Sequence, residues 1–172
     1  MTTKELHHTV QFWIEELEHY DYAELSSKPT PASWSLGQMY MHLIEATDFF
    51  LDQAIICVSI NDHAHEQSSA NAKVMFRNNE FPDKIIEGPP ANAFTPEPKN
   101  KSEILDGLNK LQIKLGEVES KLLFGGHAGK TRHPGLQYFS ANEWLHFADM
   151  HLRHHRRQKS RLDRYLQSLN SD

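Results

Sequence analysis

Cysteine is almost absent from this sequence, because Cys57 is the single one among 172 residues and no internal disulfide can form. Long apolar runs are missing too, and none approaches the roughly 18 apolar residues that a membrane helix needs. The first ten residues, MTTKELHHTV, contain no apolar core of a signal peptide. These absences predict a cytoplasmic protein that does not span a membrane.

Charge of one sign is not in large excess. The chain has 18 Lys and Arg residues against 23 Asp and Glu residues, a net charge of -5 with histidine neutral. A balance of this kind gives nucleic acid no general electrostatic attraction, so we expect no nucleic-acid partner. The sequence also lacks a phosphate-binding glycine motif, a nucleophile elbow and a Cys-x-x-Cys pair. Histidine, with 12 residues, is the type present in unusual number.

Four stretches carry apolar residues at the three- and four-residue spacing of amphipathic helices. Each opens with a capping-box pair, and the four pairs are Thr2 with Glu5, Ser35 with Gln38, Asn100 with Glu103, and Ser140 with Glu143. We expect the first helix to end near Asp21 and the second to reach Val58. The pattern predicts an all-α four-helix bundle that forms a single domain over residues 1–172.

A long connection separates the second of these helices from the third. Residues 61–100 hold five of the eight prolines and few periodic apolar positions. Unstructured loops above roughly 15 residues are uncommon in compact domains unless they have a function or are disordered. We interpret this stretch as a crossover that traverses the bundle and covers one end of it, with a short helix over residues 69–78.

The buried face of the last helix carries polar side chains in its middle. His151, His155 and Gln158 share a helical face with apolar residues before and after them. A buried polar group costs free energy unless it finds a partner. Two imidazoles one turn apart can bind a single divalent ion, and His42, at the inner edge of the second helix, is a candidate third ligand.

Three neutral imidazoles would leave a divalent ion its full charge and one or two open coordination positions. Such an ion can activate water or a thiol and polarise a carbonyl group. Gln158 is a candidate for orienting a ligand or a bound water. Glu45, one turn after His42, is a candidate partner or general base.

Each of these residues also has a simpler interpretation. Gln158 could be a buried amide bonded to a neighbouring helix, Glu45 a polar residue at the edge of its helix, and the histidines satisfied core residues. His154 competes with His155 for the ligand position, but the row through His151, His155 and Gln158 is better centred on the buried face. His146 is expected at the surface, and the histidines expected in solvated loops are His63, His65, His127 and His133. His7, His8 and His19 lie on the first helix and have no evident chelating partner.

The sequence resembles the DinB-like superfamily, which includes the YfiT-type metal-dependent hydrolases. The resemblance is carried by Trp34-Ser35 before a helix with His42, and by His151-x-x-x-His155-x-x-Gln158. Two longer stretches also resemble members of this superfamily, FTPEPKNKSEIL and HPGLQYFSANEWLHFADMHLRHHRRQ. The resemblance implies a four-helix bundle, often a homodimer, in which His42, His151 and His155 bind a divalent ion, with zinc or nickel favoured. Members with assigned activity include thiol-dependent transferases and isomerases.

Three functions are therefore considered. The first is a metal-dependent enzyme that activates water, as a hydrolase, or a low-molecular-weight thiol, as a transferase, for a small-molecule substrate. The second is a bundle that binds metal for sensing or stability, or in response to stress, without turnover. The third is an interaction module with buried histidines and no metal.

Overall fold

Four long helices form the bundle in the computed structural model, which describes residues 3–82 and 94–169. They are α1 (Thr3–Leu17), α3 (Leu36–Cys57), α5 (Lys101–Phe124) and α6 (Ala141–Leu169). Helices α1 and α3 each pack against both α5 and α6, so α1 lies diagonally across the bundle from α3. The predicted all-α bundle is confirmed.

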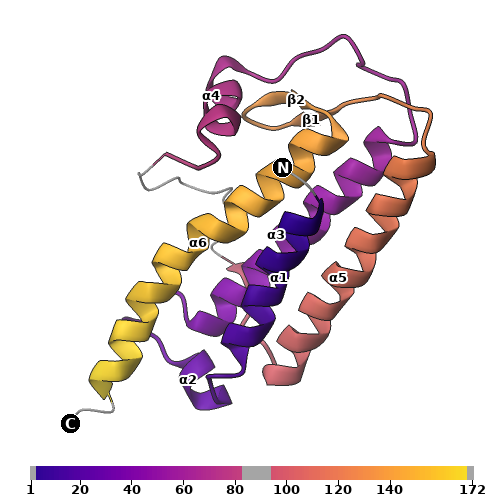
Figure 1. Ribbon diagram of the computed structural model, residues 1–172. Helices are drawn as coiled ribbons and strands as arrows, with labels where there is room; N and C mark the ends of the chain where they lie inside the picture. The colour runs from indigo at the N-terminus through magenta and orange to yellow at the C-terminus, as the bar shows by residue number, and fades with distance from the viewer. Residues whose placement is uncertain (1–2, 83–93, 170–172) are drawn as a thin grey trace.

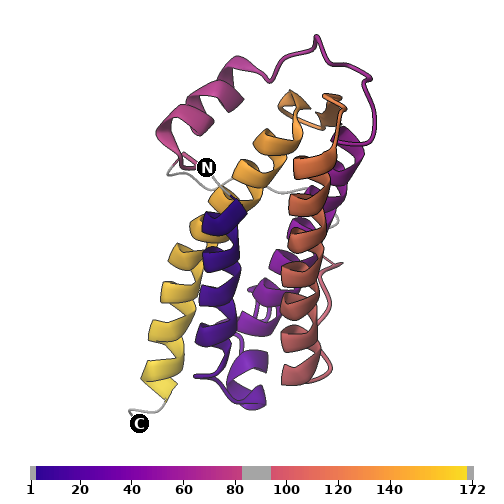
Figure 2. The same ribbon diagram turned by 45° about the vertical axis from the view of Figure 1, so that its right-hand side comes forward.

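The directions of the helices explain the long crossover. Helices α3 and α5 run parallel to each other and opposite to α1 and α6 (Figure 1). The chain must therefore return along the whole bundle between the end of α3 and the start of α5. Within this connection lies α4 (Ala70–Asn78), whose first turn is capped by Ser69, as the sequence predicts. Helix α4 lies over the end of the bundle where α6 begins (Figure 2).

Two of the predicted capping boxes are complete in the structure. At the start of α3, Ser35 Oγ accepts the Gln38 N–H and Gln38 Oε1 accepts the Ser35 N–H. Ser140 and Glu143 make the same pair of bonds at the start of α6. These bonds satisfy N–H groups that a helix start leaves unpaired. They therefore fix where the two helices that face each other begin.

The other two capping predictions fare differently. Asn100 caps α5 by accepting the Glu103 N–H, but the Glu103 carboxylate accepts the N–H of Lys99 instead of that of Asn100. Thr2 lies outside the described residues. The predicted end of the first helix near Asp21 is wrong, because α1 ends at Leu17. Asp21 instead caps the short helix α2 (Tyr22–Ser26).

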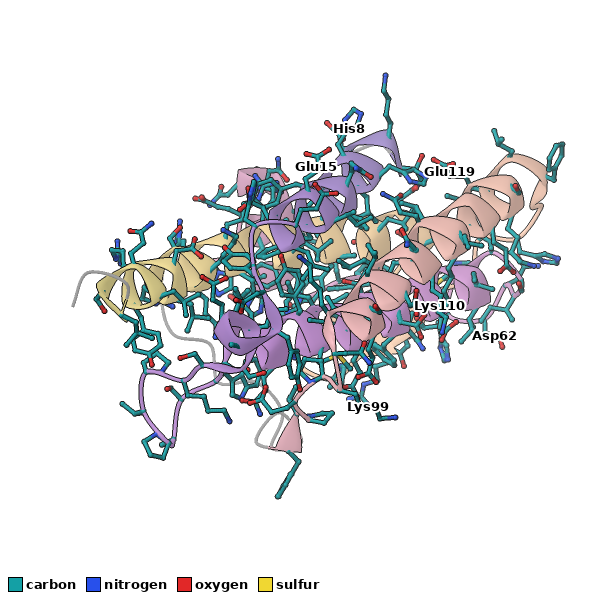
Figure 3. The ribbon with its side chains drawn as sticks, turned by 90° about the horizontal axis from the view of Figure 1, so that it is seen from below. His8, Glu15, Asp62, Lys99, Lys110 and Glu119 are labelled. Carbon is teal, nitrogen blue, oxygen red and sulfur yellow. The ribbon has the colours of Figure 1, made fainter. Side chains whose placement is uncertain are left out.

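Large apolar side chains fill the centre of the bundle. Trp13 of α1 and Tyr40 of α3 meet edge to face across the diagonal, with ring centroids 5.4 Å apart, and both are fully buried. Charged side chains such as Glu15 and Lys110 extend outward from the helices (Figure 3). The amphipathic spacing thus places apolar residues inside and charge outside, as the hydrophobic effect requires.

A short β-hairpin joins α5 to α6. Strands β1 (Thr131–His133) and β2 (Gln137–Phe139) pair antiparallel. Three residues per strand are too few to give a detectable alternation of polar and apolar residues, so the hairpin could not be predicted from the sequence. The hairpin places His133 against Trp144 and Phe147, with ring centroids 5.5 and 4.9 Å away. The expectation of a solvated loop histidine is wrong, because the ring lies in β1 and packs against these aromatic rings, and this partial burial lowers the pKa of His133 to about 4.

The burial of His133 predicts a pH-dependent stability. The unfolded chain, in which the pKa of histidine is about 6.5, binds the proton first as the pH falls. The contribution of His133 to stability is therefore present above pH ~6.5 and is lost between pH ~6.5 and ~4. We expect His133→Phe to reduce the acid-induced fall in unfolding free energy by about 2 kcal/mol. Thermal melts across this pH range measure it, with exposed His65→Phe as the control. Equal pH dependence of His133→Phe and the wild type would contradict the prediction.

Candidate metal centre

Three histidines from two facing helices meet at one point. His42 lies on the second turn of α3, and His151 and His155 lie one turn apart in the middle of α6. The Nε2 atom of His151 is 3.2 Å from that of His42 and 3.2 Å from that of His155. One ring nitrogen of each residue lies within 4.8 Å of the other two. The structure thus brings together the three residues that the sequence singled out as candidate ligands.

The spacing of these nitrogens fits a metal ion better than it fits hydrogen bonds. An imidazole nitrogen carries either one proton or one lone pair in the ring plane, so His151 Nε2 cannot make two good hydrogen bonds at once. A tetrahedral zinc ion bound at about 2.0–2.1 Å holds its nitrogen ligands about 3.3–3.4 Å apart. The two observed distances of 3.2 Å are close to that value. The cluster could therefore hold a divalent ion.

Gln158 fixes the orientation of one candidate ligand. Its Oε1 atom lies 2.8 Å from His155 Nδ1. Because an amide oxygen only accepts hydrogen bonds, Nδ1 carries the proton and the lone pair is on Nε2, which faces the cluster. A ligand histidine usually donates its second ring N–H to such an acceptor. The contact therefore supports the predicted orienting role of Gln158.

Burial keeps the three imidazoles neutral. It lowers the pKa of His42 and lowers the pKa of His151 well below its ordinary value. For His155, burial and then the neighbouring His42 lower the pKa to about 3. A metal binds the neutral imidazole, so a site built from rings that resist protonation loses little of its affinity to competing protons.

Aromatic rings surround the cluster. Trp34 lies 5.1 Å from the His42 ring, and Phe50 and Phe81 lie 5.6 and 6.1 Å from the His151 ring, centroid to centroid. Trp34 directly precedes the Ser35 cap of α3, and Phe50 lies further along the same helix. Phe81 gave no signal, because it lies in the aperiodic crossover. Such walls lower the local dielectric constant and so strengthen interactions with a bound cation.

The remaining candidate residues lie outside the cluster. Glu45 is exposed one turn after His42. His154 is partly buried, with its ring 5.4 Å from Phe81, and its neighbour His155 joins the cluster instead. His146, expected at the surface, is partly buried: its Nε2 lies 2.7 Å from Asn79 Oδ1 at the end of α4. It stabilises the packing of α4 on α6 and lies in a shallow pocket away from the cluster.

A family comparison agrees with this geometry. The model of the DinB superfamily matches residues 4–158, which include all three histidines and Gln158. The chain belongs to the DinB superfamily. No curated protein and no solved structure matches it significantly. In the described parts of the chain, no helix is both long and apolar enough to cross a membrane.

Removal of His151 is expected to abolish metal binding. His151 Nε2 is the atom close to both other ligand nitrogens, so His151→Ala leaves two ligands on different helices. We expect the wild type to retain about one zinc or nickel ion per chain after reconstitution, and the variant to bind at least ~100-fold more weakly. Mass spectrometry of metal content, on protein without a histidine tag, measures this. His146→Ala, on the same helix, should retain the ion, and equal retention by His151→Ala would contradict the assignment.

Loss of the Gln158 acceptor should weaken the site without removing a ligand. In Gln158→Leu the His155 ring loses the bond that fixes its orientation, and we expect a 10- to 100-fold loss of zinc affinity. Gln158→Glu keeps an acceptor oxygen at the same place and should stay near the wild-type affinity. Competition with a chromophoric chelator gives the dissociation constants. An unchanged affinity in Gln158→Leu would show that Gln158 has no part in metal binding.

Proposed function

We propose that this chain is a metal-dependent enzyme in which His42, His151 and His155 hold a divalent ion, with zinc or nickel favoured. The observation that carries the proposal is the convergence of three neutral ring nitrogens from α3 and α6, two pairs of them 3.2 Å apart. The reaction we propose is attack by water, as in a hydrolase, or by a low-molecular-weight thiol, as in a transferase, on a small-molecule substrate. Membership of the DinB superfamily supports it.

The composition of the cluster favours an open site over a structural one. Structural zinc sites are usually closed by four protein ligands. Among the described residues, no cysteine, carboxylate or further histidine joins the three histidines as a fourth ligand. Cys57 is buried near the far end of α3, where its thiol donates to the carbonyl of Phe139. An ion held by these three histidines would therefore keep one or two coordination positions for water or substrate.

Residues around the three histidines would have different roles in such a site. The ion, when bound, would supply a Lewis acid that lowers the pKa of a water or thiol beside it. Gln158 holds the ring of His155, and Trp34 and Phe81 cover the cluster with apolar surface. Glu45, exposed one turn after His42, is the carboxylate we propose to take the proton from the nucleophile.

Turnover assays on metal-loaded protein test the proposal. Panels of ester, amide and lactone substrates detect hydrolysis, and panels of electrophiles with bacillithiol, mycothiol or glutathione detect transfer. We expect activity in one panel, its complete loss in His42→Ala, and a 10²- to 10⁴-fold lower kcat in Glu45→Gln, which keeps its metal.

The outcomes separate the remaining alternatives. Activity that persists in His42→Ala would contradict a metal-dependent reaction. A protein that holds a stoichiometric ion but is inactive in every panel would favour a bundle that binds metal for sensing or stability. Unchanged kcat in Glu45→Gln, with His42→Ala inactive, would remove Glu45 from the mechanism but leave the metal site.

A further inference from the structure

Four buried side-chain atoms have no hydrogen-bond partner in the described part of the chain. They are Trp13 Nε1, Thr47 Oγ1, His151 Nδ1 and Arg156 Nε. Native proteins satisfy most buried polar groups, because each unsatisfied one costs free energy. An unsatisfied atom on a candidate metal ligand therefore indicates a missing interaction at the site.

The unsatisfied atom of His151 is its second ring nitrogen. Its Nε2 points at His42 and His155, so a metal bound there would leave the proton on Nδ1, as a donor. A ligand histidine almost always donates this N–H to an acceptor, which holds the ring in place. His155 has such an acceptor in Gln158, whereas His151 Nδ1 has none among the residues described.

Only one of the other three unsatisfied atoms is a hydrogen-bond acceptor. Trp13 Nε1 and Arg156 Nε are donors and cannot accept a hydrogen bond. The Arg156 guanidinium also lies over the ring of Phe12, 4.0 Å from its centroid. The hydroxyl oxygen of Thr47 is an acceptor with two lone pairs. Thr47 is thus the member of this set that offers a lone pair to a donor.

The position of Thr47 agrees with this choice. Thr47 is fully buried on α3, three residues before Phe50 and five after His42. Residues three apart on a helix lie on the same face. The rings of both Phe50 and His42 contact the His151 ring, with centroids 5.6 and 5.1 Å away. Thr47 thus lies beside Phe50 on the buried side of α3, and Phe50 packs against the ring of His151.

We propose that Thr47 is a positioning residue for the metal centre. When His151 Nε2 holds the metal, one bridging water accepts the Nδ1–H of His151 and donates to the hydroxyl oxygen of Thr47. A water is needed because neither atom has a partner within hydrogen-bonding distance, and a water with two polar partners is a common feature of protein interiors. This inference rests on the proposed metal site.

Thr47→Val and Thr47→Ser test the proposal with zinc as the ligand. Valine has nearly the shape of threonine but no hydroxyl, so Thr47→Val should weaken zinc binding about tenfold or more. The same change removes an unsatisfied buried hydroxyl, so the melting temperature of the metal-free protein should stay the same or rise. Thr47→Ser keeps the hydroxyl and should bind zinc within about threefold of the wild type. A chelator competition assay and thermal melts give both quantities.

Thr9→Val is the matched control. The Thr9 hydroxyl is also buried, but it donates to the carboxylate of Asp149 at 2.6 Å, away from the histidines. Thr9→Val should therefore lower the melting temperature of the metal-free protein, because it leaves a buried carboxylate short of a bond. It should leave zinc affinity unchanged. Thr47→Val is thus expected to lower zinc affinity without lowering stability, and Thr9→Val to lower stability without changing zinc affinity.

A spectroscopic measurement separates positioning from general packing. In the zinc-loaded wild type, the Nδ1–H proton of His151 should exchange slowly in NMR spectra, and it should exchange faster in Thr47→Val. Wild-type zinc affinity in Thr47→Val would overturn this proposal and leave the three-histidine site intact. A wild-type chain that binds no zinc or nickel after reconstitution would overturn both proposals.

Discussion

The convergence of three imidazole nitrogens between α3 and α6 is the constraint on which the rest of the site depends. Neutral nitrogens 3.2 Å apart cannot all be satisfied by one another, because each offers a single in-plane proton or lone pair. Nearby groups favour a free lone pair facing the centre. Gln158 Oε1 accepts the Nδ1 proton of His155, and burial keeps the rings uncharged. A cation at the centre would satisfy all three rings together.

The bundle supplies this arrangement through the direction of its helices. Because α3 and α5 run parallel, the chain must return from one end of the bundle to the other between them, and the described part of this crossover brings Phe81 against Phe147, His151 and His154. An ion pair also links α6 to α1: Lys159 Nζ lies 2.5 Å from the carboxylate of Glu16 on α1 and 2.9 Å from that of Asp163 on α6 itself. The helix that carries two candidate ligands is thus held on two sides, which restricts the movement of both rings.

The parts of this structure that follow from local chemistry could be predicted from the sequence. Capping boxes at Ser35 and Ser140 mark helix starts, and the spacing of His151 and His155 fixes their common face whatever surrounds them. Features that depend on tertiary packing could not be predicted. The burial of His133 requires a hairpin of three-residue strands, and the unsatisfied hydroxyl of Thr47 is recognisable only once α3 and α6 are seen together.

The buried polar groups at this site lower the stability of the fold, which is typical of a functional site. A bundle selected for stability alone would place valine at position 47 and apolar residues at positions 42, 151 and 155, because buried polar groups without partners destabilise the fold. Local rules are usually broken at functional sites, and the cost is met elsewhere in the structure. In this chain the three histidines and Thr47 lie on α3 and α6, the same two helices that supply most of the buried apolar side chains. Metal binding by the folded state alone would then stabilise the contact between α3 and α6.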